Sequence, residues 1–134
     1  MTTVYDASTL IAFLGGEQGA LVVRQTLRED RGACFIHAVN LCEVYYHVVR
    51  VRDVPMAERA MQFLDTAGIT VREDMDAAFW QDAGRLKAAY ARVSLADCYC
   101  LALARRVGGV ALTADHHEFD ALVPRGLCLI RFIR

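Results

Sequence analysis

Short apolar segments alternate along this chain with longer segments in which apolar residues recur at helical spacing. Predicted helices fill the intervals between five predicted strands, at residues 3–5, 33–37, 69–71, 110–113 and 127–133. Parallel strands require crossover connections, usually helices, and they are buried on both faces. The alternation therefore predicts an α/β fold, a three-layer α/β/α sandwich with a central parallel sheet of five strands.

Boundary residues divide the predicted helices. Gly15-Gly16 and Gly108-Gly109 follow helical segments, at positions where glycine commonly ends a helix. Asn40 and Ser94 begin helical segments, and Pro55 lies near the start of another, where proline is tolerated. No repeat, linker or low-complexity segment interrupts the 134 residues. We therefore expect residues 1–134 to form a single domain.

Composition narrows the classes of function. The formal net charge is −1, so there is no overall basic excess, and any RNA contact has to come from a local patch. The five cysteines form no C-x-x-C pair, which disfavours a zinc site and favours reduced thiols. No signal peptide and no apolar run long enough to span a membrane is visible, so we expect a cytoplasmic protein.

Four acidic residues occur where a parallel sheet would bring side chains together. Asp6 follows the first predicted strand and Asp115 the fourth, while Glu43 and Asp97 lie in the first turns of predicted helices. Ligands of such folds bind beyond the carboxyl ends of the strands. Carboxylates that converge there repel one another unless a cation neutralises them. Oxygen ligands suit Mg²⁺ or Mn²⁺, which can activate water for displacement at phosphorus.

Each acid also has a purely structural interpretation. Asn40-x-x-Glu43 fits a capping box, and Ser94-x-x-Asp97 fits one with Asp in place of Glu. Asp6 could be a turn residue, and Asp115 could cap the helix that follows it. The apolar residues around Asp97 weaken the structural interpretation there, because a lone buried acid is costly without a partner.

Four motifs taken together resemble the PIN domain and, more narrowly, the VapC-type toxins of bacterial toxin–antitoxin pairs. The motifs are Asp6-Ala7-Ser8, Asn40-Leu41-Cys42-Glu43-Val44, Ser94-Leu95-Ala96-Asp97 and Leu112-Thr113-Ala114-Asp115. The resemblance implies a Mg²⁺- or Mn²⁺-dependent endoribonuclease that forms a homodimer and is inhibited by a cognate antitoxin.

The resemblance also assigns roles to residues. Its catalytic quartet corresponds to Asp6, Glu43, Asp97 and Asp115, of which we expect Asp6, Asp97 and Asp115 to bind metal. Ser8 and Thr113 correspond to hydroxyl residues that support these ligands. We expect Asp120 to add a supporting acid at the rim, and His116 and His117 to lie on a surface loop. His37 is a departure, because many members carry a small hydroxyl residue there.

Other classes fit less well. Response-regulator receivers need paired acids after the first strand, and haloacid-dehalogenase phosphatases need D-x-D, whereas this chain has Asp6-Ala7-Ser8. No G-x-G-x-x-G motif for dinucleotide binding follows the first strand. A non-catalytic module that binds RNA or protein, a stand-alone RNA-processing nuclease and a nuclease of structured DNA stay open as alternatives.

Overall fold

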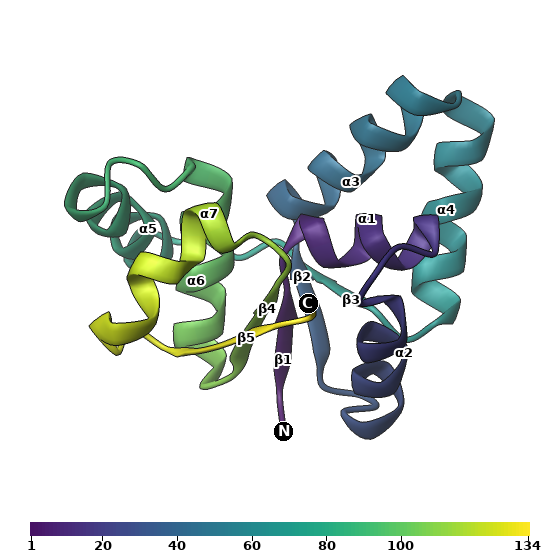
Figure 1. Cartoon of the computed structure of the whole chain (residues 1–134). Coiled ribbons are helices and arrows are strands. Elements are labelled where there is room, and N and C mark those ends of the chain that lie inside the picture. Colours follow the sequence, from purple (N-terminus) through teal and green to yellow (C-terminus); the bar gives the residue numbers. More distant parts are fainter.

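The computed structural model describes residues 1–134 and contains one five-stranded sheet (Figure 1). All neighbouring strands are parallel, in the order β3-β2-β1-β4-β5. The strands are β1 (Thr3–Tyr5), β2 (Cys34–His37), β3 (Thr70–Arg72), β4 (Val110–Thr113) and β5 (Leu129–Phe132). The predicted parallel sheet of five strands is thereby confirmed.

Helices cover both faces of this sheet. They are α1 (Ala7–Gly15), α2 (Ala20–Glu29), α3 (Ala38–Val51), α4 (Val54–Thr66), α5 (Ala77–Ala89), α6 (Leu95–Val107) and α7 (His116–Phe119), followed by a 3₁₀ helix (Asp120–Arg125). Figure 1 shows α5 and α6 on one side of the sheet and α1, α2 and α4 on the other. The three-layer α/β/α sandwich is confirmed. None of the helices combines the length and the apolar composition needed to cross a bilayer.

Two hydrophobic clusters fill the spaces between the layers. Val4 and Ala111 belong to the cluster beneath α5 and α6, whereas their neighbours Tyr5 and Leu112 belong to the cluster beneath α1 and α2. Successive strand residues point to opposite faces, so each central strand must be apolar on both. This double burial is why the central strands β1 and β4 are short, mainly apolar runs in the sequence.

The connections reverse the strand order beside β1. The chain runs from β1 outward to β2 and β3, and then returns to the other side of β1 to form β4 and β5. Ligand sites of open parallel sheets lie at such a reversal of strand order. Tyr5 pairs with Leu112 in the register. The residues after β1 and those after β4 therefore leave the sheet at the same level.

The helix boundaries agree with the sequence at the glycines and differ at α3. Gly16 and Gly108 adopt left-handed backbone conformations, with φ of 62° and 64°, directly after α1 and α6. The prediction that Asn40 begins a helix is wrong, because α3 begins at Ala38. His37 caps this helix through its side chain, which accepts a hydrogen bond from the Val39 N–H. An imidazole is an unusual cap, and the pattern of acids and amides did not reveal it.

Candidate metal centre

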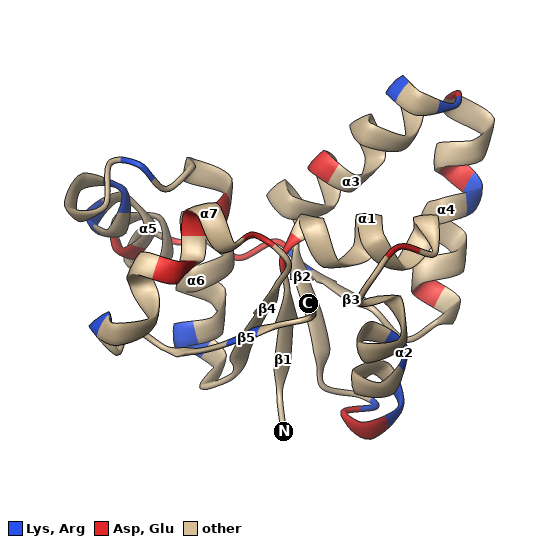
Figure 2. Cartoon of the chain, viewed as in Figure 1, with Lys and Arg blue, Asp and Glu red and all other residues tan.

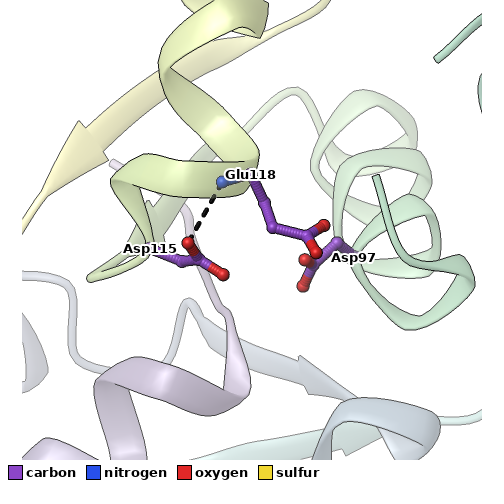
Figure 3. Close-up of side chains that lie close together, drawn as sticks. All are labelled: Asp97, Asp115 and Glu118. Atoms are coloured by element: carbon purple, nitrogen blue, oxygen red, sulfur yellow. Dashed lines mark hydrogen bonds between the residues drawn. The ribbon is translucent and has the colours of Figure 1, made fainter. Parts of the chain in front are cut away.

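Three carboxylates meet beyond the carboxyl ends of β1 and β4 (Figure 3). They belong to Asp97 in the first turn of α6, Asp115 after β4, and Glu118 in α7. One oxygen of each lies within 4.8 Å of the others. Figure 2 shows that acidic positions of α3, α6, α7 and the strand ends gather around this edge. We call Asp97, Asp115 and Glu118 the acidic trio.

Asp6 lies beside the trio, at the end of β1, and only 3% of its surface is exposed. Its Oδ2 accepts hydrogen bonds from the hydroxyls of Ser8, at 2.7 Å, and Thr113, at 2.9 Å. The Thr113 hydroxyl in turn accepts the N–H of Asp115 at 3.0 Å. The Ser8 hydroxyl accepts the N–H of Ala114 at 3.0 Å. Two hydroxyls thus hold Asp6 and the start of the Asp115 loop in one orientation.

Asp97 is the most deeply buried member of the trio, with 6% of its surface exposed. Burial raises its pKa far above the ordinary value, and the neighbouring carboxylates of Asp6 and Glu118 raise it further. Its backbone N–H donates to Ser94 Oγ at 3.2 Å, which is one half of the predicted capping box. The other half is absent, because the Ser94 N–H donates to Glu118 Oε2 at 2.7 Å. The Asp97 carboxyl is therefore free for the site.

Glu43 lies on α3, at the border of the same cluster. It is half-buried, and its pKa is raised by burial and by the charges of Asp6 and Glu118. It does not belong to the trio. The alternative interpretation of Asn40-x-x-Glu43 as a capping box does not hold, because His37 caps α3. The Asn40 amide is fully buried, and neither of its polar atoms has a hydrogen-bond partner.

Glu118 is the site residue that the sequence reasoning did not identify. Asp115 Oδ1 accepts the Glu118 N–H at 3.1 Å, so Asp115 caps α7 and also contributes a carboxylate to the trio. The spacing Asp115-x-x-Glu118 was the available signal. This spacing is typical of the start of a helix. The Glu118 carboxylate instead accepts a hydrogen bond from Ser94, the residue just before α6.

Asp120 and the two neighbouring histidines lie away from the trio. The His116 Nδ1 lies 2.8 Å from Asp120 Oδ1, and 63% of the Asp120 side chain is exposed. The carbonyl oxygen of Arg134 and this carboxylate raise the pKa of His116. His116 and His117 are both exposed, as predicted, but they lie in α7 and not in a loop. Asp120 thus binds His116 and makes no hydrogen bond to a site acid.

The donor set fits a hard divalent cation. Five acids lie at this edge: Asp6, Glu43, Asp97, Asp115 and Glu118. None of them forms an ion pair with a lysine, arginine or histidine. Uncompensated carboxylates at this range repel one another, and only oxygen is offered as a ligand atom. These properties suit Mg²⁺ or Mn²⁺ and do not suit a zinc site built from thiolates and imidazoles.

Thr113 provides a test of how the site is supported. Thr113→Val keeps the shape of this buried side chain but removes the hydrogen bonds to Asp6 and Asp115. We expect a loss of about 1–3 kcal/mol in unfolding free energy, measured by urea denaturation. We also expect about 10–100-fold weaker Mn²⁺ binding, measured by calorimetry. The matched control is Thr26→Val. The buried Thr26 hydroxyl is hydrogen-bonded to Tyr5 on the other side of the sheet, so this variant should lose stability but keep its affinity for Mn²⁺. Equal Mn²⁺ affinities in the two variants would contradict the supporting role.

Comparison with known proteins agrees with this fold. The PIN domain family matches residues 3–123. Ribonuclease VapC42 of Mycobacterium tuberculosis is 32% identical over 114 residues, which cover 78% of this chain and 84% of that protein. DNA-bound VapBC from Salmonella typhimurium superposes with a TM-score of 0.77 at 18% identity, covering 100% of this chain and 99% of that one. A toxin–antitoxin complex from Klebsiella pneumoniae gives a TM-score of 0.73 at 16% identity, covering 99% and 98%.

The family match extends over most of the chain and includes Asp6, Glu43, Asp97, Asp115 and Glu118. The relative that is 32% identical carries the narrower name of the VapC type. The solved structures share the fold at lower identity. This chain therefore belongs to the PIN-domain family and, within it, to the VapC type.

Proposed function

We propose that this chain is a metal-dependent endoribonuclease, the toxin component of a toxin–antitoxin pair, which hydrolyses phosphodiester bonds of RNA. The observation that carries the proposal is the convergence of Asp97, Asp115 and Glu118 beside Asp6, without a basic residue to neutralise them. The ribonuclease name of the relative that is 32% identical supports RNA as the substrate.

In the proposed mechanism Asp97, Asp115 and Glu118 would hold Mg²⁺ or Mn²⁺, and Asp6 would add a fixed negative charge next to them. When bound, the cation lowers the pKa of water and stabilises the charge that develops on the phosphate. Glu43 lies outside the trio, near Asp6 and Glu118, and we assign it proton transfer from the attacking water. Ser8 and Thr113 keep the Asp6 carboxylate from turning away.

Metal removal tests this proposal directly. Purified protein stripped with EDTA should not cut RNA, because water is then not activated and the carboxylates repel the phosphate backbone. Added Mg²⁺ or Mn²⁺ should restore cleavage of a structured RNA, measured by the products on a denaturing gel. The same preparation with Ca²⁺ is a control for non-specific effects of a divalent ion. Full activity after chelation would contradict the mechanism, and binding of RNA without cleavage in any metal would favour a non-catalytic module.

We also propose a homodimer and an antitoxin partner. The solved VapBC and toxin–antitoxin complexes support a partner protein. A groove of about 470 Å³ between α1, α3 and α4 offers apolar surface, and Val51 and Phe63, which line it, are 58% and 52% exposed. Sedimentation of the chain alone at micromolar concentration should give the mass of a dimer. A monomer would contradict the dimer and leave the nuclease proposal intact.

A further inference from the structure

His37, the last residue of β2, contacts the start of α3 and the loop between β3 and α5. It caps α3, and only 1% of its surface is exposed. Its Nδ1 accepts the Val39 N–H at 3.1 Å, and its Nε2 lies 2.9 Å from the carbonyl oxygen of Asp74. Because Nδ1 accepts a hydrogen bond, we assign the ring proton to Nε2, which donates to Asp74. Both ring nitrogens are thus used, one within α3 and one toward the loop between β3 and α5.

The His37 ring also lies in a stack with two aromatic rings from other helices. Its centroid is 5.1 Å from that of Phe79 on α5 and 5.1 Å from that of Tyr99 on α6. The planes are inclined by only 4° and 8°. Phe79 and Tyr99 are themselves stacked at 5.8 Å. Stacked rings of this kind stabilise the packing beyond the area that they bury. We call these three residues the His37 stack.

The loop that receives the His37 hydrogen bond is held rigidly. The Asp74 carboxylate accepts hydrogen bonds from Arg72, at 2.8 and 2.9 Å, and from Arg106 of α6, at 3.0 Å. The hydrogen bonds from Arg72 and, to a smaller extent, the hydrogen bond from Arg106 lower the pKa of Asp74 to about 2. The guanidinium of Arg106 also lies 5.3 Å from the centroid of Phe79. His37 therefore donates to the backbone carbonyl of a residue whose side chain is held by two arginines.

Two members of the His37 stack lie close in the sequence to site acids on different helices. Glu43 follows His37 by six residues on α3, and Asp97 precedes Tyr99 by two residues on α6. Figure 1 shows α3 and α6 on either side of the strand ends. We propose that His37 is a positioning residue that fixes α3 relative to α6, and so fixes Glu43 relative to Asp97. This inference rests on the proposed function, because these two acids matter together only in that site.

Two substitutions separate this role from simple helix capping. His37→Asn keeps a side-chain oxygen that can cap α3, but it removes the ring and is too short to reach Asp74. Tyr99→Leu removes the ring on α6, whereas Tyr99→Phe keeps it. We expect His37→Asn and Tyr99→Leu to raise the Kd for Mn²⁺ about tenfold and to lower kcat about tenfold at saturating Mn²⁺. The KM for RNA should change less than about twofold, and Tyr99→Phe should behave like the wild type.

A stability control completes the experiment. Val23→Ala removes buried atoms beneath α2, on the other side of the sheet, and should lower the melting temperature without changing the Kd or kcat. His37→Asn with wild-type Kd and kcat, or with changes no larger than those of Val23→Ala, would overturn the positioning role. Calorimetry of Mn²⁺ binding needs no RNA. Wild-type protein that binds Mn²⁺ but cuts no RNA would therefore refute the proposed function while the Kd values still test His37. Wild-type protein that does not bind Mn²⁺ would overturn both.

Discussion

Asp97→Asn should abolish RNA cleavage and leave the metal-free fold as stable as the wild type or more stable. Asn has the same shape but cannot supply the charge that the metal needs. We expect activity to fall by at least about a hundredfold. Substituting a residue that only supports a metal ligand already lowers metal affinity or activity about 10–100-fold, and Asp97 is proposed to be a ligand itself. The gain in stability follows from the burial of Asp97 and from the neighbouring charges of Asp6 and Glu118, which disfavour its ionised form in the fold.

The pH dependence of the stability of the metal-free protein gives a second test of the effect of the Asp97 charge. A carboxyl whose pKa is raised in the fold stabilises the fold fully below its unfolded pKa, about 3.9, and loses this contribution as the pH rises above that value. In EDTA, the melting temperature of Asp97→Asn should therefore exceed that of the wild type at pH 7, and the difference should be small at pH 4. Asp53→Asn is the matched control, because Asp53 caps α4 and asparagine caps equally well. A loss of about 0.5–1 kcal/mol at pH 7 in Asp97→Asn would indicate instead that Asp97 stabilises the start of α6.

The sheet and most helices could be predicted because burial determines them locally. Strands such as β4 are buried on both faces, which forces continuous apolar runs that no exposed loop would carry. The glycines after α1 and α6 adopt conformations that other residues disfavour, so they mark helix ends directly. The start of α3 could not be predicted, because histidine is not a common cap. The His37 ring is held in its capping position by contacts that only the fold provides, a hydrogen bond to Asp74 and stacking on two aromatic rings.

The site was predictable where an acid follows a strand or begins a helix. Asp6 and Asp115 leave neighbouring parallel strands, so topology alone brings them to one edge. Asp97 could be inferred from the apolar residues around it, which make an isolated charge costly. Glu118 could not, because its carboxylate crosses from α7 to the Ser94 N–H, and no spacing along the chain encodes that distance. The same contact gives Glu118 two roles, and these can be separated by substitution.

Glu118→Gln should weaken metal binding and catalysis while it preserves the start of α6. The Gln amide oxygen can still accept the Ser94 N–H, which now donates to Glu118 Oε2 at 2.7 Å. The negative charge, however, is lost from the trio. We expect the Kd for Mn²⁺ to rise and kcat to fall by about 10–100-fold each. The melting temperature in EDTA should stay equal or rise, because a charge that raises the pKa of Asp97 is removed.

Glu118→Ala removes both roles and shows what the hydrogen bond alone contributes. It should impair metal binding as Glu118→Gln does, and in addition it should lose about 0.5–2 kcal/mol of unfolding free energy, because the Ser94 N–H loses its acceptor. Glu58→Gln on α4 is the matched control, since Glu58 is exposed and accepts a hydrogen bond only from Tyr45. Suppose that Glu118→Gln binds Mn²⁺ and turns over RNA like the wild type, while Glu118→Ala is only less stable. Glu118 would then be a cap for α6, and the metal would be held by Asp6, Asp97 and Asp115, the set that the sequence alone predicts.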